Sequence, residues 1–88
     1  MKPFTLSYTV EAAKRIRHLH PALKQEIRMA LDSLTEEPWS GKSLKRELMG
    51  LLSLRVKAYR IIYHIDEKKG RIVILTLGKR KTIYEEIV

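Results

Sequence analysis

Residues 51–84 read LLSLRVKAYRIIYHIDEKKGRIVILTLGKRKTIY, and this stretch decides the fold. Apolar residues alternate with polar ones along 52–56, and along 59–65 every second residue is apolar, the period of a β-strand with one buried face. The run 71–77 is nearly all apolar and β-branched, as expected of a central strand. The polar segment 66–70 ends in glycine and predicts a turn. Together these patterns predict an antiparallel sheet.

The chain before this stretch predicts one more strand and two helices. Residues 4–8 alternate as a short strand does, and Thr9 is a good N-cap for a helix that we expect to end at His20. Pro21 suits the first position of a second amphipathic helix, which should run to about Glu36. Two helices with so short a joint form an αα-hairpin, whose apolar stripes need a sheet face to cover.

The expected fold class is therefore α+β, with one domain spanning residues 1–88. We expect a twisted antiparallel sheet of about four strands with the hairpin packed on one face. Residues 38–50 are predicted to be a loop with a helical turn near 44–49, and residues 78–81 to leave the sheet. Residues 82–88 should form a short helix or tail.

The charge is unevenly distributed. The chain has 18 Lys and Arg against 10 Asp and Glu, a net charge of +8. Residues 39–84 hold 12 basic and 3 acidic side chains, 12 − 3 = +9, whereas residues 1–38 hold 6 and 5, a net +1. Charge confined to the β half indicates a face that binds a polyanion.

Composition also excludes several classes of protein. No apolar run reaches the length of a transmembrane helix, and the N-terminus lacks the apolar core of a signal peptide, so we expect a cytoplasmic protein. The absence of cysteine removes disulfides, thiolate catalysis and cysteine-bound zinc. His18 and His20 lack a third ligand, so neither a metal nor another cofactor is expected.

Three short motifs in this order carry a resemblance to a known family. They are Ala-Tyr-Arg-Ile-Ile-Tyr at 58–63, Gly-Lys-Arg-Lys at 78–81 and Ile-Tyr at 83–84. With the expected order of elements, the chain resembles the RelE/ParE superfamily of toxins from toxin–antitoxin modules, and the RelE branch more than the other. That resemblance implies an endoribonuclease that cleaves messenger RNA in the ribosomal A site by attack of a 2′-hydroxyl.

The resemblance places the motif residues at Arg60, Arg80 and Tyr84, with a further basic position at Arg55. Guanidinium groups match phosphate oxygens and stay charged, and a tyrosine can stack on an unpaired base. The strand lysines of the best-known RelE enzymes are replaced by Leu51 and Ser53.

Other groups must then carry protons. Lys57, expected on the same strand face as Arg55, is the favoured proton carrier and completes the predicted catalytic set. Lys45 is a second candidate, and Glu47 and His64 are weaker ones. The remaining cations near the sheet are expected to bind RNA: Lys45, Arg46, Lys79 and Lys81.

Two other functions stay open. The missing lysines favour a ParE-like inhibitor of DNA gyrase without nuclease activity, and a degenerate, non-toxic module that binds RNA or an antitoxin is the third possibility. Both toxin hypotheses imply a cognate antitoxin with an acidic amphipathic segment and a hetero-oligomeric complex with it. The nuclease hypothesis adds the ribosome and mRNA as partners.

Overall fold

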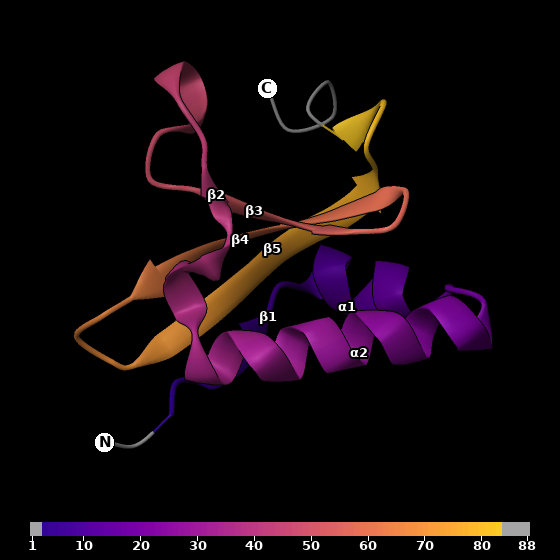
Figure 1. Ribbon diagram of the computed structural model, residues 1–88, viewed down its shortest axis with the longest axis horizontal. Coiled ribbons are helices and arrows are strands. Elements are labelled where there is room, and N and C mark those ends of the chain that lie inside the picture. Colours follow the sequence, from indigo (N-terminus) through magenta and orange to yellow (C-terminus); the bar gives the residue numbers. More distant parts are fainter. Residues whose placement is uncertain (1–2, 84–88) are drawn as a thin grey trace.

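The structure is a computed structural model that describes residues 3–83 and consists of a curved sheet with two helices on one face (Figure 1). The helices are α1 (Val10–Arg17) and α2 (Pro21–Glu36). Two short 3₁₀ helices, η1 (Pro38–Ser40) and η2 (Arg46–Leu48), lie between α2 and the main strands. The strands are β1 (Thr5–Tyr8), β2 (Lys42–Ser43), β3 (Leu52–Val56), β4 (Tyr59–Asp66) and β5 (Arg71–Lys79).

The sheet has five strands in the order β1-β5-β4-β3-β2, and it is mixed. The expected class is confirmed, but the expectation of about four antiparallel strands was wrong in two respects. β1 pairs with β5 in parallel, with Leu6 opposite Ile72. β2 has only two residues, Lys42 and Ser43, paired with β3, and so short a strand shows no alternation in sequence.

β5 also continues further than its apolar pattern indicates. Gly78 pairs with Arg60 and Lys79 with Tyr59, so the sheet ends after Lys79 rather than before Gly78. Strand pairing uses backbone groups, which glycine and lysine supply as well as valine does. Arg80 follows directly after the strand and starts the segment that leaves the sheet.

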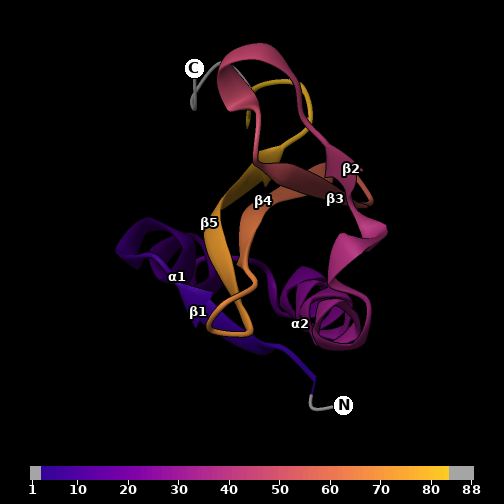
Figure 2. The ribbon, with the colours of Figure 1, turned by 90° about the vertical axis from the view of Figure 1, so that its left-hand side faces the viewer.

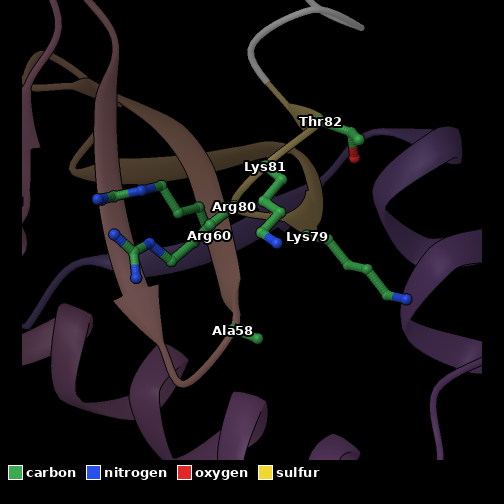
Figure 3. A pocket seen from close by; sticks show the side chains of 6 residues that line it. All are labelled: Ala58, Arg60, Lys79, Arg80, Lys81 and Thr82. Carbon is green, nitrogen blue, oxygen red and sulfur yellow. The ribbon is translucent and has the colours of Figure 1, made fainter.

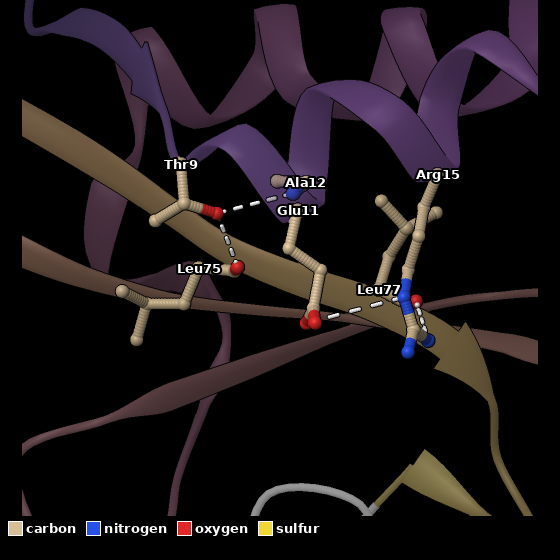
Figure 4. A network of polar contacts seen from close by, with 6 residues as sticks. All are labelled: Thr9, Glu11, Ala12, Arg15, Leu75 and Leu77. Carbon is tan, nitrogen blue, oxygen red and sulfur yellow. Dashed lines mark hydrogen bonds and ion pairs between the residues drawn. The ribbon is translucent and has the colours of Figure 1, made fainter.

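The expected helix signals are confirmed at the helix starts. The Thr9 hydroxyl accepts a hydrogen bond from Ala12 N at 3.1 Å and donates one to the carbonyl of Leu75 on β5 at 2.6 Å (Figure 4). Pro21 occupies the first turn of α2, where its missing N–H is harmless. α1 ends at Arg17, earlier than expected, which leaves residues 18–20 as the joint.

The main core lies between the helices and the sheet. Ile27, Leu31 and Leu34 of α2 are buried against Ile61 and Tyr63 of β4. A residue of this kind stabilises the fold by roughly 1.5–3 kcal/mol when fully buried. The remaining buried members of this cluster are Ala12, Leu52, Ile72, Ile74 and Leu77.

The other face of the sheet is covered only in part. The loop with η2 and the chain after β5 both rise on the side away from the helices (Figures 1 and 2). Beneath them Ser53, Ile62, Thr76 and Ile83 are buried, although none of them belongs to the helix-side cluster. The sheet is therefore covered on one side by helices and on the other by two irregular segments.

Tyr63 of β4 attaches the chain segment before β2 to the sheet. Its hydroxyl donates a hydrogen bond to the carbonyl of Pro38 at 2.9 Å and accepts one from Gly41 N at 3.0 Å. A Cβ atom at Gly41 would collide with that hydroxyl, so glycine allows the close approach. The buried phenol thus holds the loop between α2 and β2 against β4. Tyr63 is a core residue, since its exposed fraction is 0%.

Neither helix within residues 3–83 combines the length and the apolar character that crossing a membrane requires.

We expect Tyr63→Phe to lower the free energy of unfolding by about 1–3 kcal/mol, because it leaves the carbonyl of Pro38 and the N–H of Gly41 without a partner. Urea unfolding followed by circular dichroism measures this change. Tyr59→Phe is the matched control, since the Tyr59 hydroxyl makes no hydrogen bond within residues 3–83. Equal losses in the two variants would contradict the anchoring role of Tyr63.

The same hydroxyl should make stability depend on alkaline pH. Burial raises the pKa of Tyr63 above its ordinary value of 10.0, and the hydrogen bond from Gly41 offsets part of that rise. The native state therefore holds the proton more tightly, so this stabilisation is complete below pH 10.0 and is lost as the pH rises through the folded pKa. Unfolding free energy measured against pH should fall less steeply in Tyr63→Phe than in the wild type.

Candidate functional site

Arg60 is positioned by the register of three strands. It lies on β4, directly opposite Arg55 of β3 on one side and Gly78 of β5 on the other. Its neighbours Tyr59 and Ile61 pack in the helix-side core. Alternation therefore turns Arg60 to the face of the sheet away from the helices, which we call the open face. There its Nη1 donates a hydrogen bond to Ser53 Oγ at 3.2 Å.

Arg80 reaches the same region from the end of β5. Its backbone N donates to the carbonyl of Ala58 at 2.8 Å, which ties the departing chain to the turn between β3 and β4. The side chains of Arg60 and Arg80 extend in the same direction, whereas Lys79 points away from them (Figure 3). Two guanidinium groups, one from β4 and one from the segment after β5, therefore share one location.

These groups line a cavity of about 680 Å³. Its wall is formed by Ala58, Arg60, Lys79, Arg80, Lys81 and Thr82. Four of these six residues are cations, and none is acidic. Such a cavity suits an anion, and the fork of a guanidinium group suits the oxygens of a phosphate.

The pairing of Arg55 with Arg60 is unfavourable for folding. Side chains directly opposite each other on adjacent strands have Cβ atoms about 5 Å apart, and like charges at that distance repel. Arg55 Nε donates to the carbonyl of Lys57 at 3.4 Å, a long bond that offers little compensation. A bound phosphate would neutralise this repulsion. Arg55 does not line the cavity itself but borders it through Arg60.

Lys57 does not lie where the sequence placed it. The prediction put it on the same strand face as Arg55, but it is the first residue of a two-residue turn and has a φ of 54°. Its Nζ forms an ion pair with Glu26 Oε1 of α2 at 2.8 Å. The turn reverses the side-chain direction that strand alternation would give, so the ammonium group points to the helices rather than to Arg60.

The other predicted residues divide by position. Lys79 and Lys81 line the cavity. Lys45 and Arg46 are exposed in the loop before β3 and do not line it. Tyr84 lies outside the described residues, as does the side chain of Glu47. His64 lies four residues beyond Arg60 on β4, about 13 Å along a strand.

Sequence reasoning missed two residues that shape the cavity. Ser53 was interpreted as the loss of a lysine, yet its hydroxyl accepts the hydrogen bond from Arg60. Gly78 was expected outside the sheet, yet it lies opposite Arg60 and presents no side chain there. The sequence did hold one indication for Ser53. The two-residue turn at Lys57 and Ala58 fixes the register of β3 with β4, and this register sets Ser53 diagonal to Arg60.

Within residues 3–83 no three His, Asp or Glu side chains come together as a metal site would require.

Comparison with known proteins gives consistent matches. The profile of a family described as the ParE toxin of the type II toxin–antitoxin system parDE matches residues 6–84. The chain is 37% identical over 84 residues to Toxin RelG of Mycobacterium tuberculosis, covering 93% of this chain and 97% of the relative. It is 29% identical over 84 residues to Toxin RelE of the same organism, covering 93% and 87%.

Solved structures agree with these matches. The toxin–antitoxin complex RelBE2 from Mycobacterium tuberculosis contains a chain 35% identical to this one, with a TM-score of 0.81 over 91% of this chain and 94% of that chain. The isolated Escherichia coli RelE toxin is 20% identical with a TM-score of 0.76, covering 96% of this chain and 94% of that one, a likeness in fold.

We expect Arg55→Gln to raise the free energy of unfolding by about 0.2–1 kcal/mol, because it removes the repulsion with Arg60. Urea unfolding at low and high salt measures this change, and the gain should shrink as salt screens the charges. Lys68→Gln, in the turn between β4 and β5, removes one positive charge elsewhere and serves as the control. A stability gain of the same size in the control would show a general charge effect instead.

Proposed function

The chain belongs to the ParE toxin family of type II toxin–antitoxin systems, and from this premise we propose that it is a RelE-like endoribonuclease that cleaves mRNA on the ribosome. One observation carries the proposal: Arg60 of β4 and Arg80, which directly follows β5, line the same cationic cavity. Two guanidinium groups at one cavity suit the oxygens of a phosphodiester, the group that such an enzyme cleaves. Its targets, ribosomes and mRNA, place this activity in the cytoplasm.

The reaction we propose is an internal transesterification. The 2′-hydroxyl of a ribose attacks the adjacent phosphorus, the bond from phosphorus to the 5′-oxygen breaks, and a 2′,3′-cyclic phosphate remains. A base takes the proton from the 2′-hydroxyl, and an acid gives one to the leaving 5′-oxygen. Negative charge increases on the phosphate oxygens in the transition state. Arg60 and Arg80 are placed to stabilise that charge.

The arrangement of Arg60 favours transition-state binding. The Ser53 hydroxyl holds one nitrogen of the guanidinium group, and the β-sheet holds its backbone on both sides. Groups fixed in advance need no reorganisation as charge develops, which makes them more effective than mobile surface cations. The backbone of Arg80 is anchored by the bond from its N–H to the carbonyl of Ala58.

Proton transfer falls to a different lysine from the one the sequence suggested. Lys57 is held by Glu26 on the helix side, and Lys79 points away from the two guanidinium groups (Figure 3). Lys81 is the other cavity lysine. We assign the proton-carrying role to Lys81, with the phenol of Tyr84 as the expected base-stacking or orienting group.

The antitoxin that such a toxin requires should be acidic where it covers the site. The basic half of the chain, residues 39–84, carries a net charge of +9. An acidic amphipathic segment would neutralise the cavity and mask it from RNA. This assignment uses charge complementarity alone, so salt should weaken the complex.

A second function has an observation in its favour. Leu51 and Ser53 occupy the positions of the RelE strand lysines, and the matching profile is that of ParE toxins. A ParE-like toxin would inhibit DNA gyrase by binding it and would not cleave RNA. A gyrase supercoiling assay with the purified chain tests this alternative. A degenerate, non-toxic module would have no effect on growth when overexpressed.

We expect induction of the wild-type chain to produce new mRNA 5′ ends in phase with codons, and Arg80→Ala to abolish them. Loss of one group that stabilises developing charge costs about 3 kcal/mol, a hundredfold or more in rate. Primer extension on a translated message measures this effect. Lys81→Met should also reduce cleavage, whereas Lys68→Met in the distant turn should not. Growth arrest with intact mRNA, together with inhibited supercoiling, would overturn the nuclease proposal in favour of gyrase.

Co-expression of the small open reading frame next to this gene should restore growth. The reason is that its product would cover the cationic cavity, and affinity measured by titration should fall steeply with added salt. Arg60→Gln combined with Arg80→Gln should weaken the complex more than Lys68→Gln combined with Lys69→Gln, which removes the same charge. Equal affinity for both double variants would show that the antitoxin binds away from the cavity.

A further inference from the structure

The cationic cavity lined by Arg60 and Arg80, here called the arginine cavity, continues into two neighbouring depressions. A second depression of about 430 Å³ shares Lys79 and Thr82 with it. A third, of about 370 Å³, shares Arg15 and His18 with the second. Shared wall residues make the three depressions neighbours. They form a path from the open face of the sheet, past the end of β5, to the exposed side of α1, and we call this path the β5–α1 track.

The track is built from segments far apart in sequence. The second depression lies between two parts of the chain. The end of α1 and the joint after it contribute Arg15, His18 and Leu19, and the strand ends contribute Tyr59 and Lys79. Glu11 and Lys14 of α1 complete the third depression. α1 and β5 are packed against each other, so the position of the path follows from the core of the fold.

Two polar contacts hold the side chain of Arg15 in place along the track. Its Nη1 donates to the carbonyl of Leu77 on β5 at 3.0 Å, and its Nε lies 3.9 Å from Glu11 Oε2 (Figure 4). The Arg15 side chain is only 34% exposed, so it lies against the strand. A cation in this position attaches α1 to β5 and leaves a positive surface beside the end of the strand.

Lysines mark both ends of the track beyond the cavity. None of the hydrogen bonds or ion pairs within residues 3–83 engages the ammonium group of Lys79, which is exposed and points toward α1 (Figure 3). Lys14 is also exposed and lines the third depression. Glu11 is the one acidic residue that lines any of the three depressions, and it lies beside Arg15. Lys79 and Lys14 are therefore placed to bind phosphates in sequence.

We propose that single-stranded RNA held at the arginine cavity continues along the β5–α1 track, with flanking phosphates at Lys79 and then at Lys14. This inference rests on the proposed function, because the cavity supplies the first phosphate. Continuity with that cavity favours RNA over an acidic peptide, since a nucleic acid carries charge at every residue and can follow a path of separate cations. The Tyr59 side chain in the wall of the second depression offers a flat ring beside the path.

Binding of 2′-O-methyl oligouridylates, which resist cleavage, tests the track. The affinities of a trinucleotide and a nonanucleotide are measured by fluorescence anisotropy over a range of salt concentrations. Each phosphate neutralised on a single strand contributes about 0.7 to the slope of log affinity against log salt. We expect the nonanucleotide to show a steeper slope than the trinucleotide in the wild-type chain.

Single variants then locate the extra phosphates. Lys14→Gln should lower the nonanucleotide slope by about 0.7 and leave the trinucleotide slope unchanged. Lys79→Gln should lower the nonanucleotide slope as well. Lys68→Gln removes the same charge from the turn at the other end of β5 and should change neither slope.

Three results would overturn the track: equal slopes for the two RNAs in the wild type, a Lys14→Gln variant that behaves like Lys68→Gln, or a Lys14→Gln variant that weakens antitoxin binding but not RNA binding. If the chain cleaves mRNA on ribosomes in phase with codons but the oligonucleotide slopes show no phosphates bound on the track, this inference alone is overturned. Track binding without cleavage would overturn the nuclease proposal alone, so the two failures are distinguishable.

Discussion

The hydrogen-bonded pairing of β5 with its neighbours is the constraint on which the structure depends. β5 pairs with β4 on one side and with β1 on the other, and its carbonyls also receive the Thr9 hydroxyl and the Arg15 guanidinium group. Satisfying these backbone acceptors fixes α1 over the strand. The register with β4 then sets Gly78 opposite Arg60 and brings Arg80 to the turn at Ala58.

A β-bulge in β5 shifts the register of this strand with β4. Pairing shifts between Ile62 and Tyr63, so that Ile62 faces Thr76 whereas Tyr63 faces Ile74. The extra residue, Leu75, exposes its carbonyl to Thr9, which caps α1. After the bulge, Leu77 continues the helix-side core, Gly78 lies opposite Arg60 and Lys79 lies opposite Tyr59. Bulges commonly re-aim side chains near functional sites, and here the shifted alternation leaves the position opposite Arg60 without a side chain.

The open face carries charges that folding alone does not favour. Arg55 and Arg60 lie opposite each other, and Arg80, Lys79 and Lys81 add positive charge at the same end of the sheet. Repulsion of this kind lowers stability in the free chain and is relieved by an anion, whether a phosphodiester or an antitoxin carboxylate. The aliphatic core beneath, with residues such as Ile61 and Leu77 buried, supplies the stability that the cationic face reduces.

The sequence by itself determined the two helices, the main strands and the charge asymmetry, because all three follow from local pattern. The Thr9 cap, Pro21 at the start of α2 and the alternation along β4 are read from a few adjacent residues, and the resemblance to a known family pointed to Arg60 and Arg80. Only the tertiary structure decided what depends on distant pairing: the parallel β1, the two-residue β2, and the inclusion of Gly78 in the sheet. Hydrogen bonds between strands join backbone groups, which nearly all residue types share, so the side-chain pattern does not predict which strands pair. For the same reason the sequence placed Lys57 beside Arg55, whereas a positive φ in the turn and Glu26 of α2 direct its ammonium group to the opposite side.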